Sequence, residues 1–587
     1  MARLDPHSCF DDAQPRVRAL DWHVTVDFDR RVLRGTAALH FVTPAAEPGP
    51  LDLDTRDLTI HAAVTLDGRP VPFALDAPDA VLGARLRLTL PAGTTGVRLT
   101  YETSPEASAL QWLTPRQTDG GRHPFLFSQC QAIHARAVLP VQDTPRVRVT
   151  YTAEMFVPAA LRGLMAAAHD AREVRGDVAI ERWHMPQPIP PYLFAFAVGE
   201  LESRELGPRS RVWAEPGVVD RAAAEFVDVD AMLTAAEGLF GPYPWDRFDI
   251  LTMPPSFPYG GMENPRLTFV TPTLLAGDRS LVNVVAHELA HSWTGNLVTN
   301  ADAEHFWLNE GFTVYAERRI QERLEGEEIT ALHAALGRAS LDEAIAEFAD
   351  RPALTHLRTH LWDVDPDQAY SVVPYEKGYL FLVALEAHLG RPAFDALLLA
   401  YIERFRFQSI TTDDFTAFVQ AQAPGALAAV RAKGWIDGPG VPDDAPAPNS
   451  ARLARIEAMG DAVPDATVVA DWTPAEWQLY LQRRLDTPSL ALCETLDAHW
   501  HLNDSGNFEV LVAWLELALR SGYAPAVPRT AEVLGQVGRM KYLKPLYRAL
   551  SASPETRTLA RETFERASAG YHPIARQVIA GMLGVGP

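Results

Sequence analysis

The sequence predicts a multidomain α+β protein, and three changes of pattern along its 587 residues support this prediction. In the first third, apolar residues such as Trp22, Val24 and Val26 alternate with polar ones, which is typical of half-buried strands. From about residue 220 the apolar period becomes helical. The stretch 437–450 is rich in proline and glycine, and the sequence beyond it has a helical pattern.

The predicted domains follow these changes of pattern. The alternation recurs at Leu86, Leu88 and Leu90 and again around Tyr151, so we expect an antiparallel β domain at the N-terminus. Proline lacks the backbone N–H that helices and sheets use, so we expect a linker after the mixed middle section. The predicted boundaries are 1–200 for the β domain, 201–437 for the mixed domain, 438–450 for the linker and 451–587 for the helical domain.

The C-terminal section carries signals for helix starts and ends. Thr473 is a candidate N-cap, Pro474 suits the first helical position and Glu476 completes a capping box. A further helix is expected over 508–520, ending near Gly522. Successive helices with short connections predict an all-α bundle or solenoid, although we find no repeat of fixed length.

The charge balance excludes some partners. The chain has 53 Lys and Arg against 75 Asp and Glu, and its net charge of −22 repels phosphate backbones, so we expect no nucleic-acid partner. The cysteines Cys9, Cys130 and Cys493 form no C-x-x-C pair, which argues against a disulfide framework or a thiolate metal cage. There is no apolar targeting segment and no run of the ~18 apolar residues that a spanning helix needs. We therefore expect a cytoplasmic protein without membrane insertion.

His287, Glu288 and His291 form an H-E-x-x-H pattern on an apolar, helix-forming background. The spacing of four residues places both imidazoles on one helical face, close enough to share a tetrahedral metal ion. Glu288 lies beside them and can act on a bound water. Zinc is the expected ion. An ordinary helix with two histidines is the alternative that this pattern alone leaves open.

Glu310 is the candidate third ligand, since eighteen residues separate it from His291 and allow a second helix to return to the first. Two histidines and one carboxylate leave a metal vertex open, which is typical of catalytic zinc sites. Glu310 could instead be a helix N-terminal carboxylate favoured by the macrodipole. Glu317 lies seven residues further on and is a candidate to orient a ligand, or else a solvated charge beside Arg318 and Arg319.

A second cluster, Tyr259-Gly260-Gly261-Met262-Glu263-Asn264, lies upstream of the histidines. Two glycines allow a substrate backbone to approach closely, and a carboxylate just beyond them can hold a cation. By itself, a Gly-Gly pair indicates only a turn. Next to a zinc helix it is typical of a recognition loop of an exopeptidase, in which Glu263 binds the free α-amino group of a peptide.

These two motifs, G-G-M-E-N and H-E-x-x-H-x18-E, resemble those of the M1 gluzincin aminopeptidases. The segments 127–134, 367–378 and 538–541 are similar to the branch of that family that contains leukotriene A4 hydrolase, a bifunctional aminopeptidase and epoxide hydrolase. The resemblance spans nearly the whole chain. It implies a saddle-like N-terminal β domain, a thermolysin-like zinc catalytic domain and a C-terminal helical domain that enclose a deep cleft.

The resemblance also implies roles for individual residues. It implies that one Zn²⁺ per chain is bound by His287, His291 and Glu310, with Glu288 as general base and Tyr375 as oxyanion donor. It implies that the substrate amine is contacted by Gln129, Gln131 and Glu263, beside Tyr259, Gly260, Gly261 and Met262. It also implies that a substrate carboxylate is held by Arg539 and Lys541, and that a lipid epoxide is handled by Asp367 and Tyr370.

From the residues alone, plainer interpretations stay open. Gln129 and Gln131 alternate along a probable strand and could face solvent. Arg539 and Lys541 stand near Lys544 and could belong to a solvated basic helix face. Without the family, the segment around Tyr375 indicates only a loop that enters a helix.

The predicted function is a zinc aminopeptidase that removes the N-terminal residue of short peptides through a zinc-activated water, with Glu288 as general base. The alternative is an epoxide hydrolase of a fatty-acid-derived epoxide in the same zinc site, so that a lipid epoxide is a second possible partner. A third hypothesis is a non-catalytic scaffold that uses the helical domain to bind partners.

Overall fold

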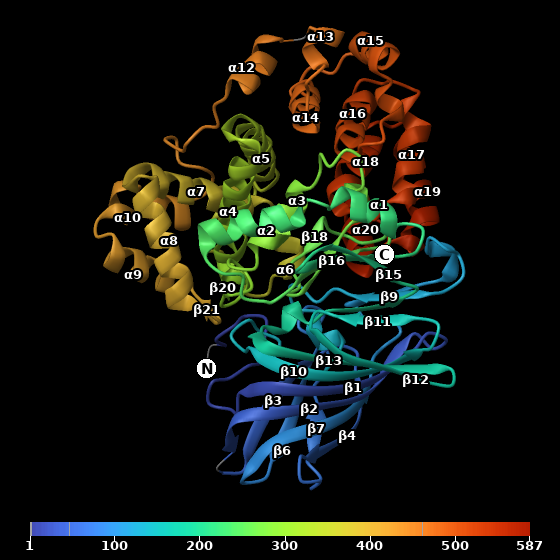
Figure 1. The fold of residues 1–587 in the computed structure, drawn as a ribbon, viewed down its shortest axis with the longest axis vertical. Coiled ribbons are helices and arrows are strands. Elements are labelled where there is room, and N and C mark those ends of the chain that lie inside the picture. The colour runs from blue at the N-terminus through green and yellow to red at the C-terminus, as the bar shows by residue number, and fades with distance from the viewer. Residues whose placement is uncertain (1–2, 46, 461, 587) are drawn as a thin grey trace.

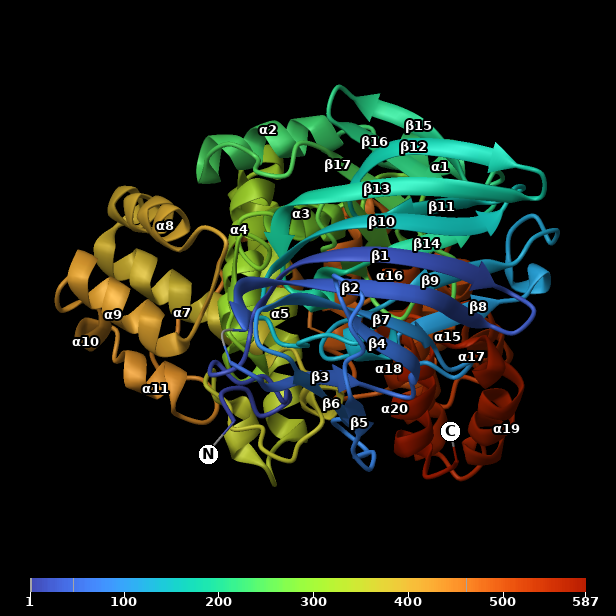
Figure 2. The same cartoon turned by 90° about the horizontal axis from the view of Figure 1, so that it is seen from below.

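The N-terminal section of the computed structural model is built on a seven-stranded sheet (Figures 1 and 2). The structure describes residues 3–45, 47–460 and 462–586. In spatial order the large sheet contains β12 (Ala168–Arg175), β13 (Val178–Ile189), β10 (Val149–Pro158), β1 (Val17–Asp27), β2 (Val32–Ala45), β7 (Thr94–Glu102) and β4 (Thr59–Thr65). Two smaller sheets contain β3 (Gly49–Thr55), β6 (Ala84–Leu90) and β5 (Phe73–Leu75), and β11 (Arg162–Met165), β14 (Phe196–Gly199), β9 (Phe125–Ser128) and β8 (Leu110–Leu113).

The alternation seen in the sequence corresponds to burial in the sheet. Trp22, Val24 and Val26 of β1 all point into the core, and the Trp22 indole N–H donates to the Tyr101 hydroxyl at 2.8 Å. One pairing differs from the predicted antiparallel arrangement, because β1 and β10 run parallel, with Trp22 opposite Ala153. The period of a strand determines which face is buried but not the direction of its neighbour.

The middle section combines a five-stranded sheet with helices. The sheet contains β15 (Glu202–Gly207), β16 (Ser210–Ala214), β17 (Phe248–Thr252), β19 (Leu267–Val270) and β18 (Gly261–Met262), and a strand pair is formed by β20 (Val298–Asn300) and β21 (Gln408–Ile410). The helices are α1 (Val219–Glu225), α2 (Val229–Phe240), α3 (Asn283–Ala290), α4 (Trp307–Glu325), α5 (Glu327–Glu347), α6 (Pro366–Ala369), α7 (Val373–Leu389), α8 (Arg391–Phe405), α9 (Thr412–Gln422), α10 (Ala426–Ala429) and α11 (Ala432–Ile436). One continuous hydrophobic core runs through this section and the β section.

Helices α4 and α7 cross at a pair of glycines. A Cβ atom built on Gly378 would lie 2.7 Å from the Gly311 Cα, and the same holds in reverse, so no larger side chain fits at the crossing. A buried ion pair between Arg318 of α4 and Glu376 of α7, at 2.8 Å, lies close to the crossing. The crossing brings Glu310, next to Gly311, close to the start of α7.

The C-terminal section is helical and has its own core. Its helices are α12 (Ala451–Ala458), α13 (Ala466–Val469), α14 (Pro474–Gln482), α15 (Leu490–Trp500), α16 (Phe508–Arg520), α17 (Ala526–Gln536), α18 (Met540–Ala552), α19 (Arg557–Ala567) and α20 (Pro573–Leu583). The predicted capping box at the start of α14 is present, with the Thr473 N–H donating to Glu476 at 2.8 Å. Residues 438–450 contain neither helix nor strand. The domain boundaries themselves stay predictions.

The helical section is attached to the loop that precedes β18. Gly538 donates its backbone N–H to the Pro255 carbonyl at 2.7 Å, and Met540 donates to the Pro258 carbonyl at 2.9 Å. Helix α5 of the middle section also contributes Leu332 to the C-terminal core. The start of α18 is therefore held next to the G-G-M-E-N segment.

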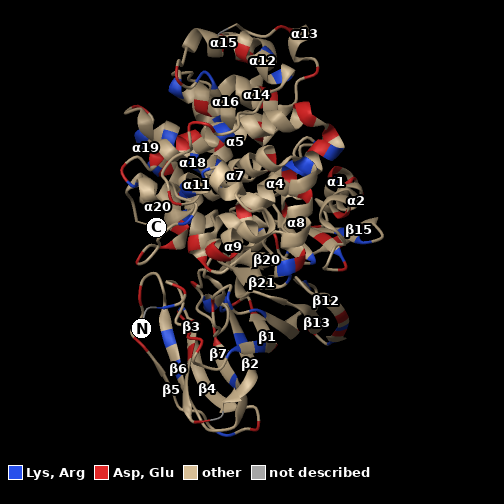
Figure 3. Cartoon of the chain, turned by 90° about the vertical axis from the view of Figure 1, so that its left-hand side faces the viewer, with Lys and Arg blue, Asp and Glu red and all other residues tan. Residues whose placement is uncertain are grey.

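In Figure 3 acidic and basic residues are interspersed along the ribbon, so the net negative charge of the chain is distributed. Among the helices of the described residues, none has both the length and the apolar character that crossing a bilayer requires.

The helix crossing generates a stability prediction. We expect Gly378→Ala to destabilise the protein by about 1–3 kcal/mol, because the added methyl group would overlap the α4 backbone. Urea unfolding followed by tryptophan fluorescence measures the change. Gly535→Ala in α17 is the matched control: nothing lies within 4 Å of its added Cβ among the described residues, so it should be neutral or stabilise by about 0.5–1 kcal/mol. Equal effects of the two substitutions would contradict the packing argument.

Candidate active site

Three donor atoms converge between α3 and α4. The Nε2 atoms of His287 and His291 lie 3.2 Å apart, and each lies 3.5 Å from Oε2 of Glu310. Helix α3 ends at Ala290 and His291 is its C-cap, while Glu310 stands in the first turn of α4. The chain therefore returns after the first helix, as the eighteen-residue spacing predicted.

Hydrogen bonds on the far side of each imidazole orient the rings. His287 Nδ1 lies 2.9 Å from Oε2 of Glu317, and His291 Nδ1 lies 3.1 Å from the Thr294 carbonyl oxygen. Because these partners accept hydrogen bonds, each Nδ1 carries the proton and each Nε2 presents a lone pair to the centre. Glu317 thus orients a candidate ligand and is not a solvated charge; its neighbour Arg318 is paired with Glu376.

This donor set fits a divalent cation. Metal–nitrogen and metal–oxygen bonds of ~2.0–2.2 Å in a tetrahedral site separate the donors by about 3.3–3.6 Å, close to the observed separations. Glu310 Oε2 is buried and has no hydrogen-bond partner among the described residues. Two lone pairs and an unpaired carboxylate oxygen in one buried place are stable together only around a positive charge. The alternative interpretations of His287, His291 and Glu310 do not explain this geometry.

Glu288 is buried next to the donor triangle and faces β18. A Cβ atom on Gly261 would overlap the Glu288 carboxylate, so only glycine fits at the first position of β18. Burial raises the pKa of Glu288 well above its usual range. The structure thus explains one glycine of the Gly-Gly pair by the space that this carboxylate needs.

Glu263 lies immediately after β18. It is buried, and burial and the nearby Glu310 carboxylate raise its pKa. Gln131 donates to it at 3.2 Å, and Gln129 donates to the Met262 sulfur at 3.1 Å. The alternative of a solvent-facing strand does not hold for Gln129, which follows the end of β9 at Ser128 and is almost fully buried, whereas Gln131 is half-buried.

Tyr375 enters the site from the first turn of α7, as the loop-to-helix pattern predicted. Its ring stacks at 6.1 Å on the ring of His287, and its hydroxyl lies 3.0 Å from that of Tyr370. Burial raises the pKa of Tyr375 well above its usual range, so the phenol stays protonated and can donate a hydrogen bond. Tyr259 packs against Tyr370 at 6.0 Å.

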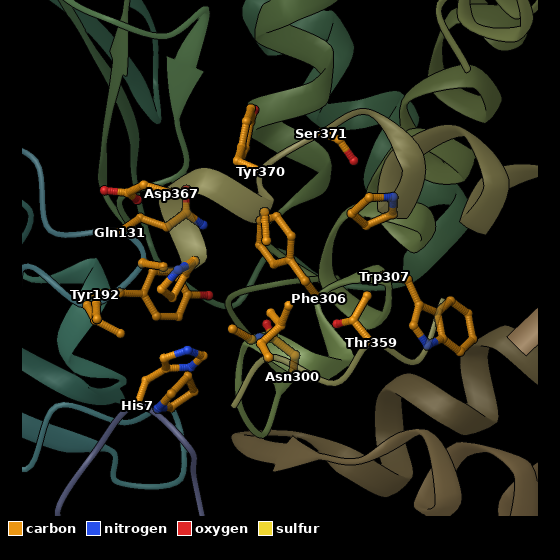
Figure 4. Close-up of a pocket in the computed structure, with 18 of the residues that line it drawn as sticks. His7, Gln131, Tyr192, Asn300, Phe306, Trp307, Thr359, Asp367, Tyr370 and Ser371 are labelled. Carbon is orange, nitrogen blue, oxygen red and sulfur yellow. The ribbon is translucent and has the colours of Figure 1, made fainter. Parts of the chain in front are cut away.

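A mainly apolar pocket opens beside these tyrosines, with about 950 Å³ of empty space when its open mouth is included (Figure 4). Gln131, Tyr259, Tyr370 and Asp367 contribute to its lining. Asp367 accepts a hydrogen bond from His134 at 2.8 Å. Although burial opposes ionisation, His134 and Arg56 hold the pKa of Asp367 below its ordinary value.

Arg539 and Lys541 share a carboxylate that the sequence did not reveal. Glu509 of α16 accepts from Arg539 Nη1 at 3.2 Å and from Lys541 Nζ at 2.7 Å. Although burial opposes it, Lys541 and Arg539 lower the pKa of Glu509 to about 2. The Arg539 side chain is 6% exposed and Lys541 is 57% exposed, so a purely solvated basic face is wrong for Arg539. Arg539 Nη2 packs against Gly260, 2.8 Å from where a Cβ would stand.

Glu509 and Tyr542 were not identified from the sequence, nor were the Thr294 and Thr313 groups that lie behind the His291 ring. Tyr542 accepts from Arg539 at 2.6 Å, and its position three residues after Arg539 on α18 was a usable signal. Glu509 lies thirty residues before Arg539 and carries no such signal. The Thr313 hydroxyl donates to the Thr294 carbonyl at 2.6 Å, which the chain brings together only in the folded state.

Comparison with known proteins gives a consistent result along the chain. Residues 17–193 match the Peptidase M1 N-terminal domain, residues 225–435 match the Peptidase family M1 domain, and residues 472–583 match the domain described as Leukotriene A4 hydrolase, C-terminal. These matches confirm the predicted multidomain fold.

Individual relatives cover almost the whole chain. It is 39% identical to Leukotriene A-4 hydrolase of Xenopus laevis over 98% of both chains, and 38% identical to Leucine aminopeptidase 2 of Yarrowia lipolytica over 94% of this chain and 90% of the relative. The structure of yeast LTA4 hydrolase in complex with bestatin matches with a TM-score of 0.93 at 32% identity, over 99% of this chain and 98% of that chain. The chain therefore belongs to the M1 peptidase family, in the subgroup of leukotriene A4 hydrolase and leucine aminopeptidase 2, and is a metallo-aminopeptidase.

Proposed function

We propose that this protein uses one Zn²⁺ per chain to hydrolyse the first peptide bond of short peptides. The observation that carries the proposal is the triangle of donor atoms of His287, His291 and Glu310, with the Glu288 carboxylate beside it. The chemistry of the donor set, two imidazoles and one carboxylate, is that of a catalytic zinc site. The intact donor set disfavours the hypothesis of a non-catalytic scaffold. A cytoplasmic location stays a prediction.

Each residue around the triangle then has a stated task. Zinc, when bound, supplies Lewis-acid polarisation and makes water acidic enough to lose a proton near neutral pH. Glu288 takes the proton of the attacking water on its carboxylate and gives it to the leaving amine. The Tyr375 hydroxyl donates a hydrogen bond to the carbonyl oxygen, where negative charge develops. Tyr370, 3.0 Å from Tyr375, holds that phenol in place.

The register of the substrate is expected to follow from two oppositely charged groups, Glu263 on one side and the pair Arg539 and Lys541 on the other. Glu263, supported by Gln131 and next to Gln129 and Met262, provides a buried anion for the free α-ammonium. Arg539 and Lys541 provide the opposite charge for a terminal carboxylate, since their summed charge exceeds that of Glu509 by one unit. Because the α-ammonium is anchored at Glu263, one residue is removed from the N-terminus at a time. Because the carboxylate is held as well, short peptides are favoured.

The second candidate is hydrolysis of a fatty-acid-derived epoxide at the same site. The observation that favours it is the mainly apolar pocket whose lining includes Asp367 and Tyr370. Incubation of the purified zinc protein with a peptide arylamide and, separately, with an allylic epoxide distinguishes the two activities. Loss of both activities on chelation would place them at one site.

Glu288→Gln tests the general base. We expect it to retain zinc and to lose about 10³-fold in turnover of a peptide arylamide, because the amide cannot accept the proton of the water. Zinc content by mass spectrometry and kcat measure the two properties. Turnover near that of the wild type in a zinc-loaded Glu288→Gln protein would refute the assignment.

Glu317→Gln tests the orientation of His287. We expect zinc affinity to fall about 10- to 100-fold, since the carboxylate that accepts from His287 Nδ1 is replaced. Competition with a chromogenic chelator measures the affinity. Glu322→Gln, on the same helix but paired with Arg391 at the surface, is the control that should retain the affinity of the wild type. Indistinguishable affinities of the two variants would remove Glu317 from the site.

Arg539→Gln tests the carboxylate end of the cleft. We expect the ratio of kcat/KM for a free-acid tripeptide to that for its C-terminal amide to fall about 10- to 100-fold, the size of a hydrogen bond to a charged group. Arg548→Gln, on the same helix and paired with Glu347, serves as the control. An unchanged ratio in the Arg539 variant would show that the substrate carboxylate binds elsewhere.

A further inference from the structure

The pocket beside the tyrosines ends against the N-terminal segment of the chain. Asp5 and His7 contribute to its lining, and each is only 2% exposed. In Figure 4, His7 is drawn at the opposite side of the view from Tyr370 and Ser371. This part of the lining is polar, although most of the pocket is apolar.

The hydrogen bonds of His7 leave an acceptor at this end. His7 Nε2 lies 2.8 Å from the Val364 carbonyl oxygen, so Nε2 carries the proton and Nδ1 is an acceptor. Nδ1 is buried and has no hydrogen-bond partner within the described part of the chain. Arg136 donates to the His7 backbone carbonyl at 2.7 Å and fixes the segment in place. Burial lowers the pKa of His7, which keeps the imidazole neutral.

Asp5 adds a second acceptor beside the first. Its Oδ1 accepts the His7 backbone N–H at 2.8 Å and lies 3.9 Å from His7 Nδ1, too far for a hydrogen bond between the two side chains. Burial and the neighbouring Asp302 carboxylate raise the pKa of Asp5 to about 7. The end of the pocket therefore presents one unpaired acceptor, His7 Nδ1, beside a carboxyl group that already accepts a backbone hydrogen bond, and a ligand that donates a hydrogen bond there would satisfy the imidazole.

We propose that Asp5 and His7 form a subsite that binds the hydrogen-bond donors at the end of a long first side chain of the peptide. The inference rests on the proposed aminopeptidase function, because it needs the α-ammonium at Glu263 and the side chain in the pocket. A hydrocarbon end would leave His7 Nδ1 buried and unpaired, so the subsite selects against a purely apolar chain of the same length.

A panel of amino-acid arylamides with one leaving group tests the subsite. The discriminating quantity is the ratio of kcat/KM for glutamine, lysine and arginine, which end in donors, to that for norleucine and methionine, which do not. His7→Leu is expected to lower this ratio about tenfold, because the donor at the end of the substrate side chain would then be buried without an acceptor. His7→Gln keeps an acceptor and is expected to recover part of the ratio. His23→Leu, an exposed histidine of β1, is the matched control.

Asp5→Asn separates charge from hydrogen bonding. It is expected to lower kcat/KM for lysine and arginine more than for glutamine, because the amide keeps an acceptor but removes the carboxyl group that a bound cation would hold in its ionised form. Ratios that stay at the wild-type value in both the His7→Leu and Asp5→Asn proteins would overturn the subsite while leaving the aminopeptidase proposal intact. A wild-type protein that cleaves none of the arylamides would overturn the proposed function and this inference together.

Discussion

The active site depends on how closely two helices approach each other. At Gly311 and Gly378 the backbones of α4 and α7 are in direct contact, with no side chain between them. Glu310 precedes one glycine, and Tyr375 stands one helical turn before the other. The separation between a candidate metal ligand on α4 and a phenol on α7 is therefore set by backbone contact, which is stiffer than contact between flexible side chains.

Charge is the second organising constraint. Glu263, Glu288 and Glu310 bring three carboxylates into one buried region, and isolated buried anions are costly. His287 donates its Nδ1 proton to Glu317, and His291 donates its Nδ1 proton to the Thr294 carbonyl. The two imidazoles therefore supply lone pairs at Nε2 instead of positive charge. The site is thus electrostatically incomplete without cations. A metal ion and an ammonium group are the two cations that the proposed reaction provides, at different carboxylates.

The spacing of neighbouring residues predicted much of this protein, whereas contacts between residues far apart in the sequence could not be predicted from it. The four-residue interval of His287 and His291, the capping box at Thr473 and the alternation around Trp22 are each properties of one element, and the structure contains all three. The partner of Arg539 is not such a property, because Glu509 belongs to another helix. The parallel neighbour of β1 likewise depends on packing between distant segments, and the burial of Gln129 follows from its place just after the end of β9.

The two backbone hydrogen bonds from Gly538 and Met540 to Pro255 and Pro258 tie the start of α18 to the loop before β18. Main-chain contacts of this kind do not depend on side-chain identity, but they require the two backbones to approach closely: a Cβ atom on Gly538 would overlap the Ser256 carbonyl oxygen. The loop before β18 and the start of α18 therefore have to fit each other, and together they form one joint between the domains. Chimeras that exchange the last domain between relatives should transplant both halves of that joint, even though one half lies far upstream of the linker at 438–450.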